Sequence, residues 1–176
     1  MADYRRTYGC ARAWVAYHKR QRPVAVALDV VASWRDREGK VYAHQARVPR
    51  RAKVEAGNRI RALDLAGVRT FDDLFHRVQD AIGSVRGIGD LAVYDAATRI
   101  GASLGVWPEQ VYVHAGVRQG ARALGLDANR RSLPVNAFPP ELRRLDPWQI
   151  EDVLCIYKDQ LPRMARQSGQ VSRGTA

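Results

Sequence analysis

Two amphipathic segments separated by a short glycine-containing stretch constrain the fold of this chain most strongly. Residues 71–82 carry apolar side chains at helical spacing behind Thr70, which can cap a helix, and Asp72 and Asp73 follow in the first turn. A second such pattern begins near Asp90 and continues to about Leu104. The intervening stretch ends in Gly87-Ile88-Gly89, so we expect two helices joined by a tight turn.

The rest of the chain also favours helices. We expect a mainly α fold, a helical bundle with a basic helical N-terminal region. Further helices are predicted at residues 7–21, 24–34 and about 114–124, and from Pro147 onward. Residues 24–34 are rich in β-branched side chains, but their length favours a helix over a strand. The last helix has the clearest start, since Asp146 is a suitable N-cap and Gln149 can complete a capping box.

Turn and proline signals divide the chain. Residues 35–40 are expected to form a turn, and residues 133–140 a proline-rich loop. Residues 47–53 are interpreted as a basic connector that Pro49 keeps from being a regular helix. We therefore expect three segments: a basic N-terminal region, a core and a disordered tail, at residues 1–53, 54–165 and 166–176.

Length and composition bound the class of protein. A chain of 176 residues with 46% hydrophobic residues can bury a core of one domain. No apolar run is long enough for a membrane span and no secretory signal is present, so a cytoplasmic protein without membrane contact is expected. Cys10 and Cys155 lack CxxC spacing, and neither a disulfide framework, a metal site nor a cofactor is expected.

The formal net charge of +11 is unevenly distributed. Residues 1–60 hold 14 Lys/Arg against 5 Asp/Glu, a net of +9, whereas residues 61–176 hold 15 against 13, a net of +2. A basic surface attracts phosphate backbones and also suits anionic lipid headgroups. The predominance of Arg favours forked hydrogen bonds to phosphate, although it can also reflect genome composition.

The turn between the two central helices has its own chemistry. Gly87 and Gly89 would let the backbone turn tightly and approach a partner, and the free amides at the start of the next helix suit a phosphate. Ile88 would be buried and pin the turn to the core, while Arg86 would add a charge. The alternative is that the two glycines only shape a tight connection between helices.

The segment Val85-Arg86-Gly87-Ile88-Gly89-Asp90-Leu91-Ala92 resembles the hairpin of helix-hairpin-helix DNA-binding proteins. Upstream, residues 65–74 resemble a pattern common in the same proteins. From Gly87 to Arg122 the chain is similar to the helical core of DNA glycosylases of the endonuclease III type. The similarity includes Gly105-Val106-Trp107-Pro108, the segment Val111-Tyr112-Val113-His114, and then Arg118 and Arg122.

The chain departs from the glycosylase pattern at the catalytic residues. The family's catalytic aspartate falls on Tyr112, which is neutral near pH 7, and the lysine of its bifunctional members falls on Leu91. The cysteines of an iron–sulfur cluster are missing too. Several segments, among them the late Cys155-Ile156-Tyr157-Lys158-Asp159, also resemble uncharacterised bacterial and phage proteins.

A relocated catalytic site would draw on acidic and basic side chains elsewhere in the chain. The candidates are Asp95, Tyr112, His114, Asp152 and Lys158. Each has a structural alternative: Asp95 can pair with Arg99 one turn later, His114 can cap the following helix, and Lys158 can be solvated at a helix end. HExxH, GxSxG and P-loop motifs are absent from the sequence.

Three functions therefore remain open. The first is DNA binding, expected for a duplex and either non-sequence-specific or specific for a DNA structure or modification, which would make the protein nucleoid-associated. The second is base excision with displaced catalytic groups, and the third is a protein-interaction module with an acidic partner. The residues expected to bind DNA are Arg50, Arg51, Lys53, Arg86, Gly87, Ile88, Gly89, Asp90, Arg118 and Arg122.

Overall fold

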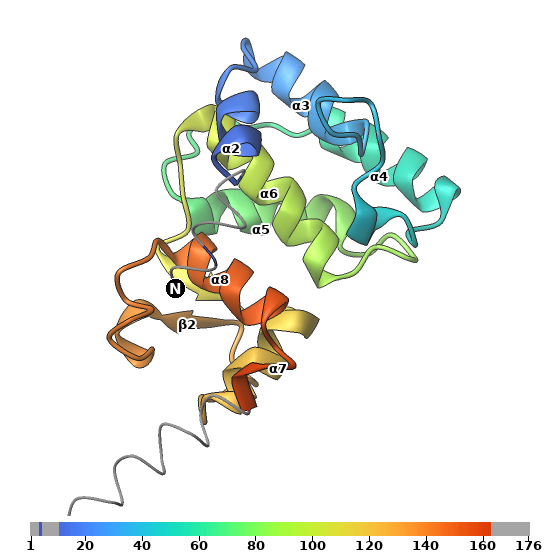
Figure 1. Cartoon of the computed structure of the whole chain (residues 1–176). Coiled ribbons are helices and arrows are strands. Elements are labelled where there is room, and N and C mark those ends of the chain that lie inside the picture. Colours follow the sequence, from blue (N-terminus) through green and yellow to red (C-terminus); the bar gives the residue numbers. More distant parts are fainter. Residues whose placement is uncertain (1–3, 5–10, 163–176) are drawn as a thin grey trace, which may run out of the picture. The chain divides into compact units, whose positions relative to one another are not determined.

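The structure, a computed structural model, describes residue 4 and residues 11–162. Figure 1 shows a mainly helical chain, as the sequence predicts, with a single two-stranded sheet in the described part. The helices are α2 (Ala11–Lys19), α3 (Val24–Ala32), α4 (Arg50–Arg61), α5 (Phe71–Ile82), α6 (Asp90–Leu104), α7 (Ala115–Ala123) and α8 (Pro147–Ile156). The strands are β1 (Gln110–Tyr112) and β2 (Ser132–Pro134), and short 3-10 turns occupy Ala43–Gln45 and Val135–Ala137.

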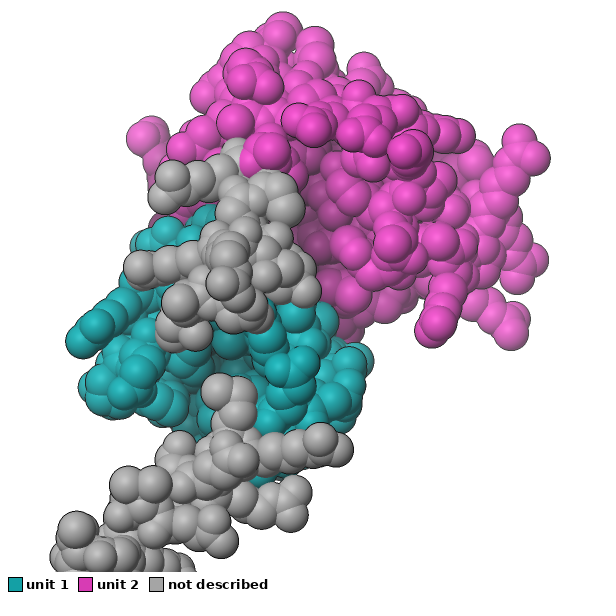
Figure 2. All heavy atoms as spheres, viewed as in Figure 1, with its two compact units in different colours: residues 1, 109–176 teal, residues 2–108 magenta. Residues whose placement is uncertain are grey.

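The chain forms two compact units, residues 2–108 and residues 109–176 with Met1, which Figure 2 shows in two colours. These units do not coincide with the three segments expected from the sequence, and those segments stay a prediction. We call residues 11–108 the N-terminal unit and residues 109–162 the C-terminal unit.

The central helices of the N-terminal unit begin where the sequence predicts. The Thr70 side chain accepts a hydrogen bond from the Asp73 amide (3.2 Å) and starts α5. Its apolar residues are buried at helical spacing: Phe71, Leu74, Phe75, Val78 and Ile82. Helix α6 contacts α2, α3 and α5 and is buried on nearly every side, and Gly105 ends it with a left-handed φ of 81°. Because α6 is packed on nearly all sides, its apolar residues do not form a single stripe. Many of its buried residues are small.

Helix α4 begins inside the stretch that the sequence analysis interpreted as a connector. Pro49 does not interrupt a helix here; it is the N-cap, and Arg50 is the first helical residue. A proline at a helix start loses no hydrogen bond, because the first amides of a helix have no partner within it. The prediction of an irregular connector at residues 47–53 is therefore wrong from Arg50 onward.

The two predictions for the neighbouring stretch are confirmed. Residues 24–32 form α3, and residues 35–40 form a turn. The Asp36 Oδ1 atom accepts hydrogen bonds from the amides of Glu38 (2.8 Å) and Lys40 (2.9 Å), and Arg35 pairs with Val41 in an isolated bridge. This turn is thus fixed by its own side chain.

In the C-terminal unit, β1 pairs antiparallel with β2, with Val111 opposite Leu133. Helices α7 and α8 pack together, and α8 begins with the expected capping box: the Asp146 amide donates to Gln149 Oε1 (3.0 Å). Of residues 133–140, expected to form only a loop, the first two belong to β2. Strands of three residues give almost no periodic signal, which explains why the sequence did not reveal them.

Among the described residues, no helix combines the length and the hydropathy needed to cross a bilayer. The start of the helix expected at residues 7–21 and the expected disordered tail at 166–176 lie outside the described residues.

Candidate nucleic-acid interface

The glycine loop, residues 83–89, connects α5 to α6. Gly87 has a φ of 101°, a left-handed conformation that other residues adopt at a cost. The Ile88 amide donates to the Val85 carbonyl (2.9 Å) and closes the turn. Val85 is 3% exposed, whereas Ile88 is only partly buried. The expectation that Ile88 is the buried pin is therefore wrong, and Val85 anchors the loop in the core.

Helix α6 begins without a side-chain cap. Its N-cap is Gly89, whose carbonyl accepts from the amides of Ala92 (2.9 Å) and Val93 (3.2 Å). Within the described part of the chain, the amides of Gly89, Asp90 and Leu91 have no hydrogen-bond acceptor. A methyl group built at Gly89 meets nothing within 4 Å, so the space beside this residue at the start of α6 is open. Three free donors at the positive end of a helix are suited to an anion.

The glycine loop lies against the start of α4. A methyl group built at Gly87 would be 3.0 Å from Pro49 Cδ and 3.5 Å from Ala52 Cβ, which shows how closely the two segments approach (Figure 1). The N-termini of α4 and α6 are therefore neighbours. Neither has a side-chain cap, so two positive helix ends are presented in one region.

The basic residues predicted to bind DNA fall into three places. Arg86 and Arg51 are exposed, beside or near the two helix ends, and have no ion-pair partner among the described residues. Arg50 and Lys53 line a groove beside α4. Arg118 and Arg122 belong to α7 in the C-terminal unit, where the Arg118 Nε atom donates to the Ala128 carbonyl (3.2 Å) and Arg122 is exposed. The first two groups both adjoin α4, the first at its N-terminal end beside the glycine loop and the second on the face that lines the groove.

Asp95, the first of the catalytic candidates, is held by three donors. Its Oδ2 atom contacts His44 Nε2, Gln45 Nε2 (2.8 Å) and Arg99 (3.4 Å). Burial raises the pKa of Asp95, but the charge of Arg99 and the hydrogen bonds from His44 and Gln45 outweigh it and hold the pKa below its ordinary value. Asp95 is therefore an ionised and fixed carboxylate at neutral pH.

Arg99 also contacts an aromatic ring: its guanidinium lies 3.7 Å from the centre of the Tyr42 ring. The Tyr42 hydroxyl hydrogen-bonds His18 Nε2 (3.2 Å). Burial, together with the charge of Arg99, lowers the pKa of His18 to about 3, so His18 is neutral at pH 7. Four residues of this network were not predicted, because their partners are distant in the chain: His18, Tyr42, His44 and Gln45.

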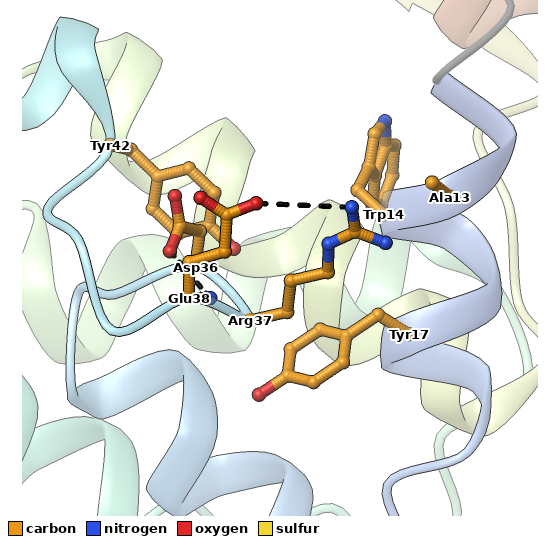
Figure 3. A pocket seen from close by; sticks show the side chains of 7 residues that line it. All are labelled: Ala13, Trp14, Tyr17, Asp36, Arg37, Glu38 and Tyr42. Atoms are coloured by element: carbon orange, nitrogen blue, oxygen red, sulfur yellow. Dashed lines mark hydrogen bonds and ion pairs between the residues drawn. The ribbon is translucent and has the colours of Figure 1, made fainter.

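A pocket of about 190 Å³ adjoins this network (Figure 3). The rings of Trp14 and Tyr17 on α2 face the carboxylates of Asp36 and Glu38 across it, and Arg37 extends between them toward Trp14. The Arg37 guanidinium is 3.9 Å from Glu38. Aromatic faces and carboxylates suit a planar cation, and the protein supplies one itself.

The other catalytic candidates belong to the C-terminal unit. His114 is the N-cap residue of α7 but makes no capping hydrogen bond with its side chain; its Nε2 atom pairs instead with Glu151. Both side chains are almost fully buried, at 2% and 8% exposure.

Two further candidates lie elsewhere in this unit. Tyr112 is buried on β1, and Lys158 pairs with Asp159 (3.0 Å). Glu151 was not predicted, although its spacing on α8 places it with the buried Ile150 and Leu154.

No group of three potential metal ligands forms among the residues that the structure describes. Comparisons with protein families, with curated protein sequences and with solved structures return no significant match. The resemblance to helix-hairpin-helix proteins and to DNA glycosylases stays a prediction.

Proposed function

We propose that the protein binds nucleic acid, with duplex DNA as the expected partner, through the glycine loop as a helix-hairpin-helix element. The observation that supports it is the contact of Gly87 with Pro49, which brings the uncapped N-termini of α4 and α6 together. Two such ends, with Arg86 and Arg51 nearby, offer backbone amides and forked side chains to phosphate oxygens. Such contacts fix a protein on a backbone and do not read bases.

The Asp90 carboxylate, directly after the glycine loop, opposes the binding of an anion there. Asp90 is the first residue of α6, its side chain is exposed, and a carboxylate there stabilises the helix while repelling a phosphate. The expected contact at this position is the Asp90 amide. Replacing the carboxylate by an amide, Asp90→Asn, should therefore tighten DNA binding.

The decisive experiment measures fluorescence polarisation of labelled single- and double-stranded oligonucleotides across a salt series. Gly89→Ala is the sharpest variant, because Gly89 has a φ of −111° and open space at its Cβ, so alanine leaves the fold intact. A phosphate that approaches this backbone as closely as glycine permits would meet the added methyl, and we expect about a tenfold loss of duplex affinity. Arg86→Gln should weaken binding and make the decrease of log K with log salt shallower, its slope changing by about one.

Arg69→Gln is the matched control. Arg69 is an exposed arginine just before a helix, like Arg86, but the helix that follows it is capped by Thr70. It should change duplex affinity less than Arg86→Gln. Equal losses for the two variants, with full affinity retained in Gly89→Ala, would reject the glycine loop as the contact. No binding even at low salt would favour a protein partner of acidic character.

Base excision is a second candidate, favoured by the fixed ionised carboxylate of Asp95. The three donors, His44, Gln45 and Arg99, all reach Oδ2, and a carboxylate held this way could stabilise positive charge on a sugar as a base departs. Incubation with duplexes that carry modified bases, followed by alkaline cleavage of abasic sites, tests the idea. Product formation that is lost in Asp95→Asn would support it, whereas intact strands with folded protein would refute it.

A further inference from the structure

A groove of about 540 Å³ lies on the other side of α4 from the glycine loop, in the N-terminal unit. Its walls are α4 on one side and, on the other, the end of α3 with the residues after it, Ala32–Arg35 and Val41. The described side chains that line it include four cations and no carboxylate. The cations are Arg35, Arg50, Lys53 and Arg61.

The helical spacing of α4 explains the placement. Arg50, Val54 and Arg61 are four and seven residues apart and therefore share one face, with Lys53 and Asn58 at its margins. The opposite face is the buried row Ala52, Ala56 and Ile60, none more than 1% exposed. Because Gly87 meets Ala52 Cβ on that other face, the groove and the glycine loop are separate sites on one helix.

The facing wall is rigidly built. Trp34, 3% exposed, has a φ of 58°, an unfavourable value for a residue with a side chain, and its indole N–H donates to the Lys53 carbonyl (2.9 Å). A methyl group built at Gly57 would be 2.8 Å from the Ala32 carbonyl oxygen, so only glycine allows α3 to end this close to α4. These two features fix the turn that presents Arg35 to the groove.

The positive charges in the groove are only partly compensated. Arg61 pairs with Asp29 (2.8 Å), and Arg35 donates to the Gly39 carbonyl, but Arg50 and Lys53 have no ion-pair partner among the described residues. The Asn58 Oδ1 atom accepts from Arg61 (3.3 Å), which leaves its amide N–H₂ available as a donor. An anion entering the groove would relieve the repulsion among the cations and gain several donors.

We propose that this groove is a second phosphate-binding site, which holds two closely spaced phosphate groups. Forked guanidinium donors, a lysine point charge and a neutral amide around a cavity of this size match a diphosphate better than a single carboxylate. The two phosphates come either from neighbouring positions of a nucleic-acid strand or from the diphosphate of a nucleotide. The site deepens the proposed nucleic-acid binding, and its test does not require the glycine loop to function.

The test compares two double variants of the full chain that have the same net charge. Arg50→Gln with Lys53→Gln removes the two unpaired cations of the groove. Arg20→Gln with Arg69→Gln removes two exposed charges that do not line it. Circular dichroism melts establish that both variants are folded. Inorganic pyrophosphate, ADP and a short single-stranded oligonucleotide are then titrated into each protein by isothermal titration calorimetry.

We expect the groove variant to bind at least one of these probes about tenfold more weakly than the control variant. Tighter binding of ADP than of pyrophosphate assigns the site to a nucleotide, and oligonucleotide binding that pyrophosphate displaces assigns it to a strand. If the two double variants behave alike toward all three probes, including no binding by either, the inference is overturned. Loss of duplex binding in Gly89→Ala with the groove titrations unchanged would concern the glycine loop alone.

Discussion

Helix α7 presents two glycines one turn apart, Gly116 and Gly120, to α8, and their substitution tests the packing of the C-terminal unit. A methyl group at Gly116 would lie 2.6 Å from the Cys155 sulfur but 3.5 Å from Cys155 Cβ. The sulfur alone is therefore the obstacle. We expect Gly116→Ala to cost about 1–2 kcal/mol, since overpacking costs about 1–3 kcal/mol and the better helix propensity of alanine returns up to about 1.

Cys155→Ala removes that obstacle and leaves an ordinary van der Waals contact of 3.5 Å. In this background Gly116→Ala should be neutral or stabilising by up to about 1 kcal/mol, so the double-mutant cycle should give a coupling of about 1–3 kcal/mol. Gly120→Ala is the control: its methyl would lie 2.5 Å from the Leu154 carbonyl oxygen, and backbone cannot rotate away. Cys155→Ala should not rescue it.

Urea unfolding followed by circular dichroism gives the free energies of the four proteins in the cycle. Coupling below about 0.5 kcal/mol would mean that the two substitutions are independent. The close approach of α7 to the Cys155 sulfur would then be refuted. Equal rescue of Gly116→Ala and Gly120→Ala would refute it in a different way, by showing that α8 as a whole moves.

Three further predictions concern buried polar groups and helix packing. His18, with a pKa of about 3 in the folded protein, stays neutral while the unfolded chain protonates near 6.5. Stability should thus fall by about 1.4 kcal/mol per pH unit as the pH drops from about 6 to about 3, and urea unfolding of His18→Gln at pH 7 and 5 should lack this component. Gly57→Ala should cost about 1–3 kcal/mol because its methyl meets the Ala32 carbonyl oxygen at 2.8 Å; an unchanged melting temperature would contradict the contact. Glu151→Gln removes the carboxylate of the buried pair with His114 and should lower the free energy of unfolding in urea by about 1–3 kcal/mol. A loss below about 0.5 kcal/mol would show that the pair does not contribute to stability.

The helices that the sequence predicted most accurately are those whose ends are determined by neighbouring residues. Thr70 and the Asp146–Gln149 pair cap α5 and α8 through contacts within three positions, and these contacts are confirmed. The start of α4 was missed because proline favours both a helix end and a helix start, and the sequence alone does not distinguish them.

The polar pairs of the candidate sites could not be predicted for a different reason. His44 and Asp95 are 51 residues apart in the chain, and His114 and Glu151 are 37 apart. Local periodicity contains no information about such partners. The pairing of Asp95 with Arg99, one helical turn away, is by contrast the one contact of this cluster that the spacing indicated.

The position of Pro49 at the start of α4 fixes the distance along that helix between the two proposed phosphate sites. Pro49 starts α4 against the glycine loop, and the 12 residues of α4 then extend about 16 Å from Arg50 to Arg61 along the groove. That length corresponds to about five nucleotides of one strand of a duplex, at about 3.4 Å each. A strand bound at both sites must therefore pass around the first turn of α4, where Arg50 stands. Removing Arg50 and Lys53 would then lower the salt slope of duplex binding by about two, whereas a groove reserved for free nucleotides would leave that slope unchanged.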